Sequence, residues 1–238
     1  MKKRIIQCLI CFIGFCTVFL VGLEGQFYSE ASVISSALLQ PNVEQAFQNV
    51  LCTCVRVQGD GHYGSGSVYR IEENSIVIVT NKHVIQYFGE NSYVTFFDGR
   101  KAEAEVLGNS ENYDVGFLEV AFEQLQEEEI FCYRAICADV GRYNDLMKND
   151  CFFMIDMASE VNSPKKYLGN VVESRKYLAD YDVEMFYGDA YTKPGMSGCG
   201  LFDAYGNYIA MLSGGTEYLE VAAVPVDVIA DEYEKIKK

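Results

Sequence analysis

Short apolar segments of strand length, separated by turn-forming residues, follow one another along most of this chain. Residues 75–79 are almost all β-branched and predict a buried strand. Residues 93–106 predict a β-hairpin whose turn is Asp98-Gly99. Regularly spaced short strands favour an antiparallel barrel over alternating strands and helices, so we expect an all-β fold.

The strand pattern falls into two groups, about residues 50–125 and about residues 146–226. The segment between them is rich in Glu and Gln, includes the run Glu127–Glu129, and is most simply a solvated connection. The last residues, Val226–Lys238, predict a helix because acidic residues come early and lysines late, as the helix dipole favours.

The N-terminal residues 1–26 predict a membrane anchor rather than part of the fold. Three basic residues precede the apolar stretch Ile5–Leu23, which is nearly as long as a bilayer-spanning helix. The charge distribution puts the N-terminus in the cytoplasm and the remaining chain outside. The alternative is a signal peptide cleaved after Ala31, and both predictions export the domain. Residues 27–49 predict a spacer and a helix that docks on the domain.

Composition excludes several classes of protein. Half of the 238 residues are apolar, so the chain is not disordered. The net charge of −15 argues against nucleic acid as a partner. Six of the nine cysteines lie outside the apolar N-terminal stretch, which permits disulfides, and Cys132 and Cys137 are near enough in sequence to pair. With two histidines and no Cys-x-x-Cys outside the apolar N-terminal stretch, we expect no metal site and no cofactor.

One serine among three glycines, Ser197, lies in the segment Lys193–Asp203, directly before an apolar strand. A serine hydroxyl becomes a nucleophile when a base takes its proton and a donor group receives the charge on the attacked carbonyl. The neighbouring glycines allow backbone amides to turn inward and bind that charge. The alternative is an ordinary Gly-rich turn.

A histidine and an aspartate stand upstream of Ser197 in suitable settings. His83 follows the β-branched run 75–79, and Asp114 precedes a second apolar strand. The order His, Asp, Ser is that of chymotrypsin-type proteases and differs from the orders in subtilisins and α/β-hydrolases. The other histidine, His62, lies in a turn-rich segment and is interpreted as a solvent-facing residue.

The chain resembles a trypsin-like serine protease of the chymotrypsin fold, closest to the HtrA/DegP-like branch. Three motifs carry this resemblance: Thr80–Val84, Tyr113–Leu118, and Asp189-Ala190 together with Pro194–Gly198. They span roughly residues 50–230, with a weaker match at Ala222–Val226. Cys199 stands where glycine is usual, and no sequence remains after the protease region for a PDZ domain.

The resemblance implies two six-stranded antiparallel β-barrels and a C-terminal helix within a protease domain of residues 50–238. It implies a serine endopeptidase with His83 as base, Asp114 orienting it, and Ser197 as nucleophile. The amides of Gly195 and Ser197 would form the oxyanion hole. Substrate would bind along Ser213, Gly214 and Gly215, and Tyr191 would lie near the base of the specificity pocket.

No acid stands at position 191, so we expect a small or medium apolar residue before the cut rather than Lys or Arg. The partners are then a protein or peptide substrate, the membrane through the N-terminal helix, and, as in many relatives, further copies of the chain. Two alternatives stay open: a catalytically silent protease fold that binds peptides, and an esterase using the same three residues. The natural substrate and the oligomeric state are not specified by the sequence.

Overall fold

The computed structural model describes residues 34–86, 88–89, 92–126, 130–158 and 164–238. Residues 35–238 form one compact unit, to which the following description applies. No helix in the described ranges is long and apolar enough to cross a membrane. The predicted anchor at residues 1–26, the spacer residues before position 34 and the acidic run 127–129 lie outside the described residues.

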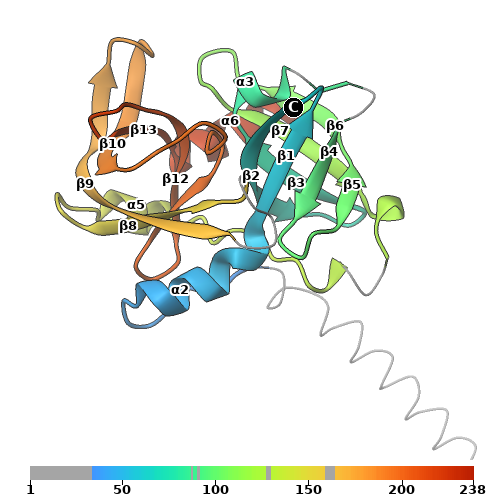
Figure 1. The fold of residues 1–238 in the computed structure, drawn as a ribbon, viewed down its shortest axis with the longest axis horizontal. Helices are drawn as coiled ribbons and strands as arrows, with labels where there is room; N and C mark the ends of the chain where they lie inside the picture. Colours follow the sequence, from blue (N-terminus) through green and yellow to red (C-terminus); the bar gives the residue numbers. More distant parts are fainter. Residues whose placement is uncertain (1–33, 87, 90–91, 127–129, 159–163) are drawn as a thin grey trace, which may run out of the picture. The chain divides into compact units, whose positions relative to one another are not determined.

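The chain forms two β-structures in sequence order, one with strands coloured cyan to green and one with strands coloured yellow to red-brown (Figure 1). The first is a seven-stranded sheet of order β5-β4-β1-β2-β3-β7-β6, and the second is a closed barrel of order β10-β13-β12-β11-β8-β9. All strand pairs within them are antiparallel. The strands of the sheet are β1 (Cys54–Gly59), β2 (His62–Ile71), β3 (Ser75–Thr80), β4 (Tyr93–Phe96), β5 (Lys101–Glu103), β6 (Glu105–Asn109) and β7 (Gly116–Ala121). Those of the barrel are β8 (Cys151–Asp156), β9 (Lys165–Leu178), β10 (Val183–Ala190), β11 (Gly200–Asp203), β12 (Tyr208–Gly215) and β13 (Glu220–Pro225).

The prediction of six strands in each half is right for the second half and wrong for the first. One residue, Ala104, separates β5 from β6. The segment on one side of it pairs with β4, and the segment on the other side pairs with β7. Residues 101–109 therefore form both edge strands of the first sheet. Before Ala104 the chain pairs with β4 at one edge, and after it with β7 at the other.

The β-branched run in β3 is buried because both faces of this strand meet apolar side chains. All six of its residues are buried. Ile76 and Ile78 belong to the core inside the first sheet, whereas Val77 and Val79 belong to a larger core that includes the barrel interior. Alternate residues of a strand point to opposite faces, so a strand between two cores is apolar at every position.

The predicted hairpin of residues 93–106 is confirmed in its turn, where Gly99 has a φ of 86°. No disulfide joins any of the described cysteines, so the pairing of Cys132 with Cys137 that the sequence permits is not present. Cys137 instead contacts the amide oxygen of Asn207. The exposed His62 begins β2 beside a two-residue turn.

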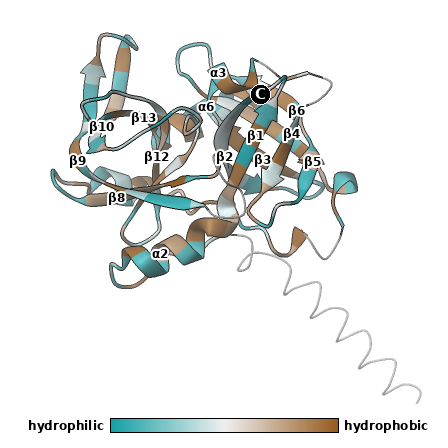
Figure 2. Ribbon diagram, in the orientation of Figure 1, coloured by the Kyte–Doolittle hydropathy of each residue, from teal (hydrophilic) through white to brown (hydrophobic). Residues whose placement is uncertain are grey.

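Short helices complete the unit: α2 (Val43–Val50), α3 (Lys82–Ile85), α5 (Val140–Asn144), α6 (Val226–Ile236), and the 3-10 turns η1 (Leu51–Thr53) and η2 (Phe122–Gln124). Helix α2 carries both hydrophobic and hydrophilic bands (Figure 2), and its Ala46 and Val50 are fully buried in the larger core. The predicted docking helix and C-terminal helix are therefore both present.

Candidate active site

His83 and Asp114 meet because the strands that carry them are neighbours. His83 lies in α3, a single helical turn that follows β3 directly. Asp114 lies just before β7. Strands β3 and β7 pair antiparallel with Thr80 opposite Gly116, so the end of one strand lies beside the start of the other.

The carboxylate of Asp114 binds His83 at two points. Its Oδ2 lies 2.7 Å from Nδ1 of the imidazole, and its Oδ1 accepts the backbone N–H of His83 at 3.0 Å. The contact with Nδ1 favours the tautomer that carries its proton there, which leaves Nε2 as the basic nitrogen. The His83 side chain is 44% exposed, so this nitrogen is available to a substrate or a nucleophile.

Asn81, which sequence reasoning did not single out, joins the two halves of the site. Its buried side-chain amide donates to the backbone carbonyl of Asp114 at 2.9 Å and to the Ser213 hydroxyl at 3.3 Å. Asn81 stands inside the motif Thr80–Val84, which was its only signal in the sequence.

Ser197 lies in a tight turn between β10 and β11 whose glycines adopt left-handed backbone angles. Gly195 has a φ of 92° and Gly198 a φ of 84°. The carbonyl of Met196 accepts the N–H of Cys199 at 2.9 Å, so the N–H of Ser197 in the same trans peptide points the opposite way. In the described part of the chain, neither the Gly195 N–H nor the Ser197 N–H has an intramolecular acceptor. These are the two donors that an oxyanion hole would need.

Ser65 in β2 holds the Ser197 turn against the first sheet. Its N–H donates to the Ser197 carbonyl at 2.8 Å, and its hydroxyl donates to the Gly195 carbonyl at 3.3 Å. Gly64 lies where an added Cβ would be 2.8 Å from Val84 and 3.1 Å from the Ser197 carbonyl. The backbone of Ser197 and the residue after His83 are therefore neighbours. Among the described residues, no hydrogen bond joins the Ser197 hydroxyl to His83.

An ion pair holds the beginning of the turn. Nζ of Lys193 lies 2.7 Å from Oδ2 of Asp156, a carboxylate at the end of β8 that is only 1% exposed. The other oxygen of Asp156 accepts the N–H of Ala158. The hydrogen bond to Asp156 raises the pKa of Lys193. Since the Lys193 carbonyl accepts the Met196 N–H, this pair also positions the first residue of the turn.

The predicted substrate-binding residues Ser213, Gly214 and Gly215 end strand β12. A Cβ on Gly215 would collide with the Thr192 side chain, and one on Gly214 would collide with the Tyr181 hydroxyl. Tyr191 is 53% exposed and stacks on Tyr167. Thr192, the neighbour of Tyr191 in sequence, therefore lies against Gly215.

Two recesses flank Tyr181, which belongs to the β9–β10 hairpin. One, of about 400 Å³, is lined by His83, Asp114 and neighbouring polar residues. The other, of about 590 Å³, is lined by Gly214, Gly215 and the barrel strands beside them. Burial raises the pKa of Tyr181, and the charges of Asp114 and Asp180 raise it further. The recesses provide room for substrate side chains on either side of a neutral phenol.

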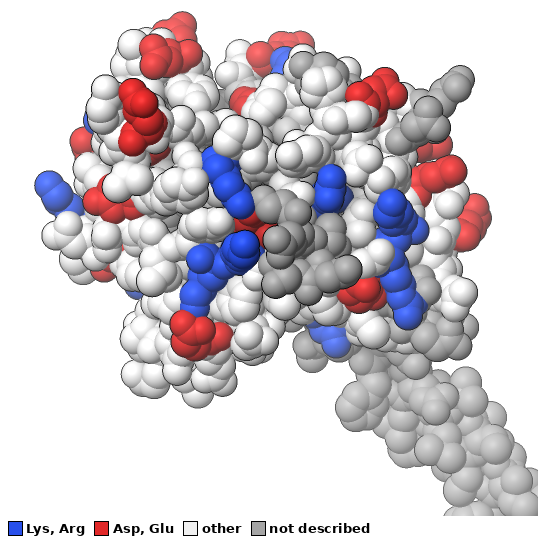
Figure 3. All heavy atoms as spheres, viewed as in Figure 1, with Lys and Arg blue, Asp and Glu red and all other residues white. Residues whose placement is uncertain are grey.

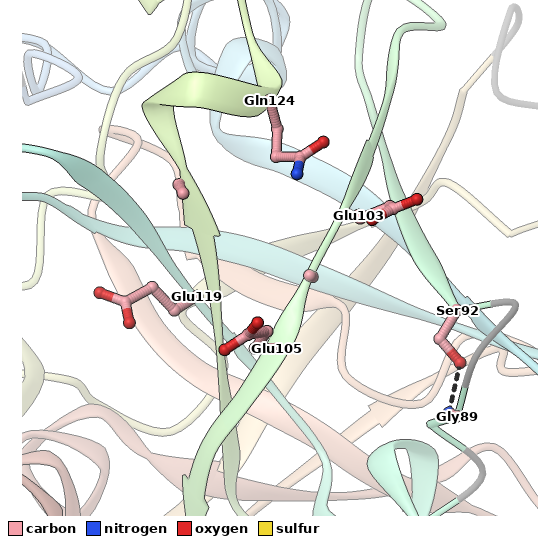
Figure 4. Close-up of a pocket in the computed structure, with 8 residues that line it drawn as sticks. Gly89, Ser92, Glu103, Glu105, Glu119 and Gln124 are labelled. Atoms are coloured by element: carbon pink, nitrogen blue, oxygen red, sulfur yellow. Dashed lines mark hydrogen bonds between the residues drawn. The ribbon is translucent and has the colours of Figure 1, made fainter.

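A further recess lies away from these residues, on the first sheet between β5, β6 and β7. Glu103, Glu105, Glu119 and Gln124 line it, and the N–H of Gly89 donates to the Ser92 hydroxyl at its edge (Figure 4). Within the described ranges, no group of three or more His, Cys, Asp and Glu side chains is arranged to hold a metal ion.

Comparison with known proteins agrees with this geometry. The profile of the trypsin-like peptidase domain family matches residues 52–211. The Staphylococcus aureus (strain bovine RF122 / ET3-1) protein named "Serine protease HtrA-like" is 24% identical over 189 residues, which are 74% of this chain and 23% of the relative. The chain thus spans about a quarter of the length of that curated relative.

Two solved structures share the fold. The HtrA-type protease AlgW with tripeptide is 21% identical with a TM-score of 0.66, over 82% of this chain and 64% of the other. Rv3671c from M. tuberculosis H37Rv, a serine-to-alanine mutant in an inactive form, is 15% identical with a TM-score of 0.64, over 84% of this chain and 96% of the other. Because the family profile covers well over half of the chain and includes His83, Asp114 and Ser197, the chain belongs to the trypsin-like peptidase family and carries an HtrA-like protease domain.

Proposed function

We propose that this chain is a serine endopeptidase that hydrolyses peptide bonds through an acyl-enzyme on Ser197. The observation that carries the proposal is the Asp114–His83 pair beside a turn whose two amides have no acceptor in the described part of the chain. A base with a fixed tautomer and free backbone donors are the two things that a serine nucleophile requires.

In the proposed reaction, Nε2 of His83 takes the proton of the Ser197 hydroxyl while Oγ bonds to the substrate carbonyl carbon. The negative charge that appears on the carbonyl oxygen is bound by the N–H groups of Gly195 and Ser197. His83 then returns its proton to the amine as the carbon–nitrogen bond breaks, and a water molecule releases the acyl group by the reverse sequence. Asp114 stays ionised throughout and stabilises the imidazolium.

The absent hydrogen bond between Ser197 and His83 is compatible with this reaction, because catalytic hydrogen bonds often tighten only when substrate binds. Support for the proposal comes from Ser65 and Gly64, which lie against the Ser197 carbonyl, and from the Val84 side chain of α3, which lies close to Gly64.

A fluorophosphonate probe tests the proposal directly, because it reacts with a serine only when a base and an oxyanion hole activate it. We expect the wild-type chain to be labelled at Ser197, as located by mass spectrometry, and Ser197→Ala to be unlabelled. Ser67→Ala is the control for an unrelated serine, since Ser67 lies in β2 and is fully buried, whereas Ser197 is partly exposed. Absence of label on the wild type would favour a protein that binds peptides without cleaving them.

Parallel assays on casein and on short-chain esters separate the endopeptidase from an esterase. Cleavage of short esters but not of casein would favour an esterase.

Replacing Asp114 tests the role of the carboxylate. Asp114→Asn removes the charge that stabilises imidazolium and presents an N–H donor to the ring, so we expect kcat to fall by about 10³–10⁴-fold. Glu105→Gln serves as the control, because this exposed carboxylate lies at the recess of Figure 4. Steady-state kinetics on a fluorogenic peptide measures both. A loss of less than tenfold in Asp114→Asn would contradict the assigned role.

We further propose that residues 1–26 anchor the chain so that the protease domain faces outward, which rests on the sequence pattern alone. An anchored chain stays with membranes after extraction with alkaline carbonate, whereas cleavage after Ala31 would release it in a form whose N-terminus is Ser32.

A further inference from the structure

Arg56 lies on the side of the first sheet that faces the Ser197 turn. In the β1–β2 pair, Arg56 is directly opposite Ser65. Directly opposite residues of antiparallel strands point to the same face, and so does Tyr63, two positions from Ser65 on β2. The Ser65 hydroxyl binds the Gly195 carbonyl, which identifies this face as the one that meets the turn.

The Arg56 guanidinium has no anionic partner within the described residues. Cζ of the guanidinium lies 4.8 Å from the centre of the Tyr63 ring. Nε is buried and has no hydrogen-bond acceptor among the described residues. By contrast, Arg142 pairs with the buried carboxylate of Asp203. Buried N–H groups are nearly always hydrogen-bonded, because leaving one unpaired costs about 1–3 kcal/mol. Among the described residues, Arg56 therefore lacks the acceptor that its charge and its N–H groups require.

Tyr63 connects this cation to the proposed oxyanion hole. The ring is half exposed, and a Cβ on Gly195 would lie 2.7 Å from its Cε2 and 3.2 Å from its Cδ2. The tyrosine edge thus rests on Gly195, while its face supports the guanidinium. Arg56, Tyr63 and the turn form one continuous surface on the side of Ser197 that belongs to the first sheet.

The position of this surface defines which part of a substrate would reach it. Ser213–Gly215, which we assign to the residues before the scissile bond, belong to the barrel. A chain that crosses Ser197 from the barrel continues over the first sheet, toward Tyr63 and Arg56. The residues after the scissile bond therefore pass the unpaired cation.

We propose that Arg56 and Tyr63 form a subsite for the carboxylate of an Asp or Glu side chain that follows the scissile bond within a few residues. The inference rests on the proposed endopeptidase function. A guanidinium presents N–H donors in a planar fork that matches a carboxylate, and stacking on a ring limits the orientations it can adopt. The charge of −15 opposes acidic substrates in general, so a local cation is needed to select them. Lys and Arg side chains gather in the middle of the face drawn in Figure 3, where most acidic side chains lie nearer the edge.

The experiment first digests a proteome-derived peptide mixture and maps the cleavage sites by mass spectrometry. One cleaved sequence is then synthesised as a matched pair with Glu or Gln at the first, second or third position after the cut. We expect the wild type to prefer Glu at one of these positions by about 3- to 10-fold in kcat/KM. Arg56→Gln should lose that preference, measured as the Glu-to-Gln ratio of kcat/KM within the same variant. Raising the salt concentration should weaken the preference.

Lys101→Gln is the matched control, because Lys101 also lies over a tyrosine ring of the same sheet, at 4.3 Å from the centre of Tyr93. This variant should keep the wild-type preference. An equal Glu-to-Gln ratio in the wild type, or an unchanged ratio in Arg56→Gln, would overturn the inference.

Binding separates this inference from the proposed function. Fluorescence anisotropy with Ser197→Ala should show tighter binding of the Glu peptide, and the difference should vanish in Ser197→Ala/Arg56→Gln. If the wild type cleaves no peptide but the binding preference is present, the endopeptidase proposal fails and the subsite stands. If peptides are cleaved and bound without a preference for Glu, the subsite fails and the endopeptidase stands.

Discussion

Single residues around Ser197 are held by contacts whose strength depends on burial. Asp156 is 1% exposed and Lys193 is 25% exposed, so their ion pair is poorly screened by solvent. Arg70 and Glu234 also pair, but their side chains are 49% and 60% exposed. Removing one partner of a buried ion pair lowers the free energy of unfolding strongly, whereas removing one partner of an exposed pair changes it little.

Asp156→Asn should therefore destabilise the fold by about 2–4 kcal/mol, because the partly buried ammonium of Lys193 loses its counter-charge. Activity should fall as well, since Lys193 begins the turn that presents Gly195 and Ser197. Glu234→Gln, which breaks the exposed pair, should cost less than about 1 kcal/mol. Urea unfolding measures both variants, and equal costs would show that burial does not govern these pairs.

Gly198 is required by both backbone angle and space. Its φ is 84°, and a Cβ would overlap the Ser65 carbonyl oxygen and lie 2.6 Å from the Thr80 hydroxyl. Gly61 has a similar φ of 80°, with no atom within 4 Å of an added Cβ. Gly61→Ala should cost about 1 kcal/mol for the angle alone, and Gly198→Ala at least about 3 kcal/mol. Urea unfolding compares the two variants. Equal losses of unfolding free energy in Gly61→Ala and Gly198→Ala would exclude a contribution from the clash at Gly198.

At the scale of elements, α6 is fastened to the first sheet through a carboxylate in the β2–β3 turn. Glu72 accepts hydrogen bonds from the Tyr233 hydroxyl and from Nζ of Lys237. The hydrogen bond from Tyr233 has the largest effect, and together with the one from Lys237 it lowers the pKa of the Glu72 carboxyl below its usual 4.5. Folding is thus linked to the ionisation of this side chain.

The sign of the pH dependence follows from that lowered pKa. A carboxylate whose pKa is lower in the folded state stabilises the fold above its unfolded pKa and loses this effect as pH falls through the folded value. Glu72→Gln should cost about 1 kcal/mol at pH 7, and the difference from wild type should disappear as pH falls below 4.5. Glu73→Gln, at the adjacent exposed position, should show no such change. Urea titrations at pH 7, 4.5 and 3 measure the difference, and a cost independent of pH would contradict the linkage.

At the scale of the whole molecule, the compact unit begins before the predicted protease boundary at residue 50. The N–H groups of Ser35, Leu38 and Asn42 donate to the carbonyls of Ala135, Tyr205 and Ala204. Ala46 and Val50 of α2 are completely buried. The segment 35–50 is therefore an integral part of the folded unit.

Shortening the chain from its N-terminus should show this boundary. A chain of residues 35–238 should unfold at the temperature of the full chain, because residues 35–238 contain the whole compact unit. A chain of residues 51–238 should unfold about 10 °C lower, because it exposes the apolar surface that α2 covers, worth on the order of 3–5 kcal/mol. Differential scanning calorimetry compares the two. Equal midpoints would assign α2 to the spacer rather than to the fold.

Much of the fold was predictable because its determinants are local. The buried strand β3, the Asp98-Gly99 turn and the C-terminal helix follow from hydrophobic period, turn chemistry and charge order. The strand count of the first sheet was not predictable, since no local pattern shows that the chain changes partners at Ala104.

The sequence by itself determined the family, the all-β class, and the placement of His83 and Asp114 beside two strands, because motifs and strand patterns occupy a few consecutive residues. Only the tertiary structure decided that Ser65 and Asp156 hold the Ser197 turn and that Asn81 joins Asp114 to Ser213. The same holds for Arg56, which lies beside the turn without an ion partner in the described ranges. The bond from Ser65 to Gly195, for example, joins residues 130 positions apart. Such contacts depend on how two β-structures pack together, and no periodicity along the chain encodes that packing.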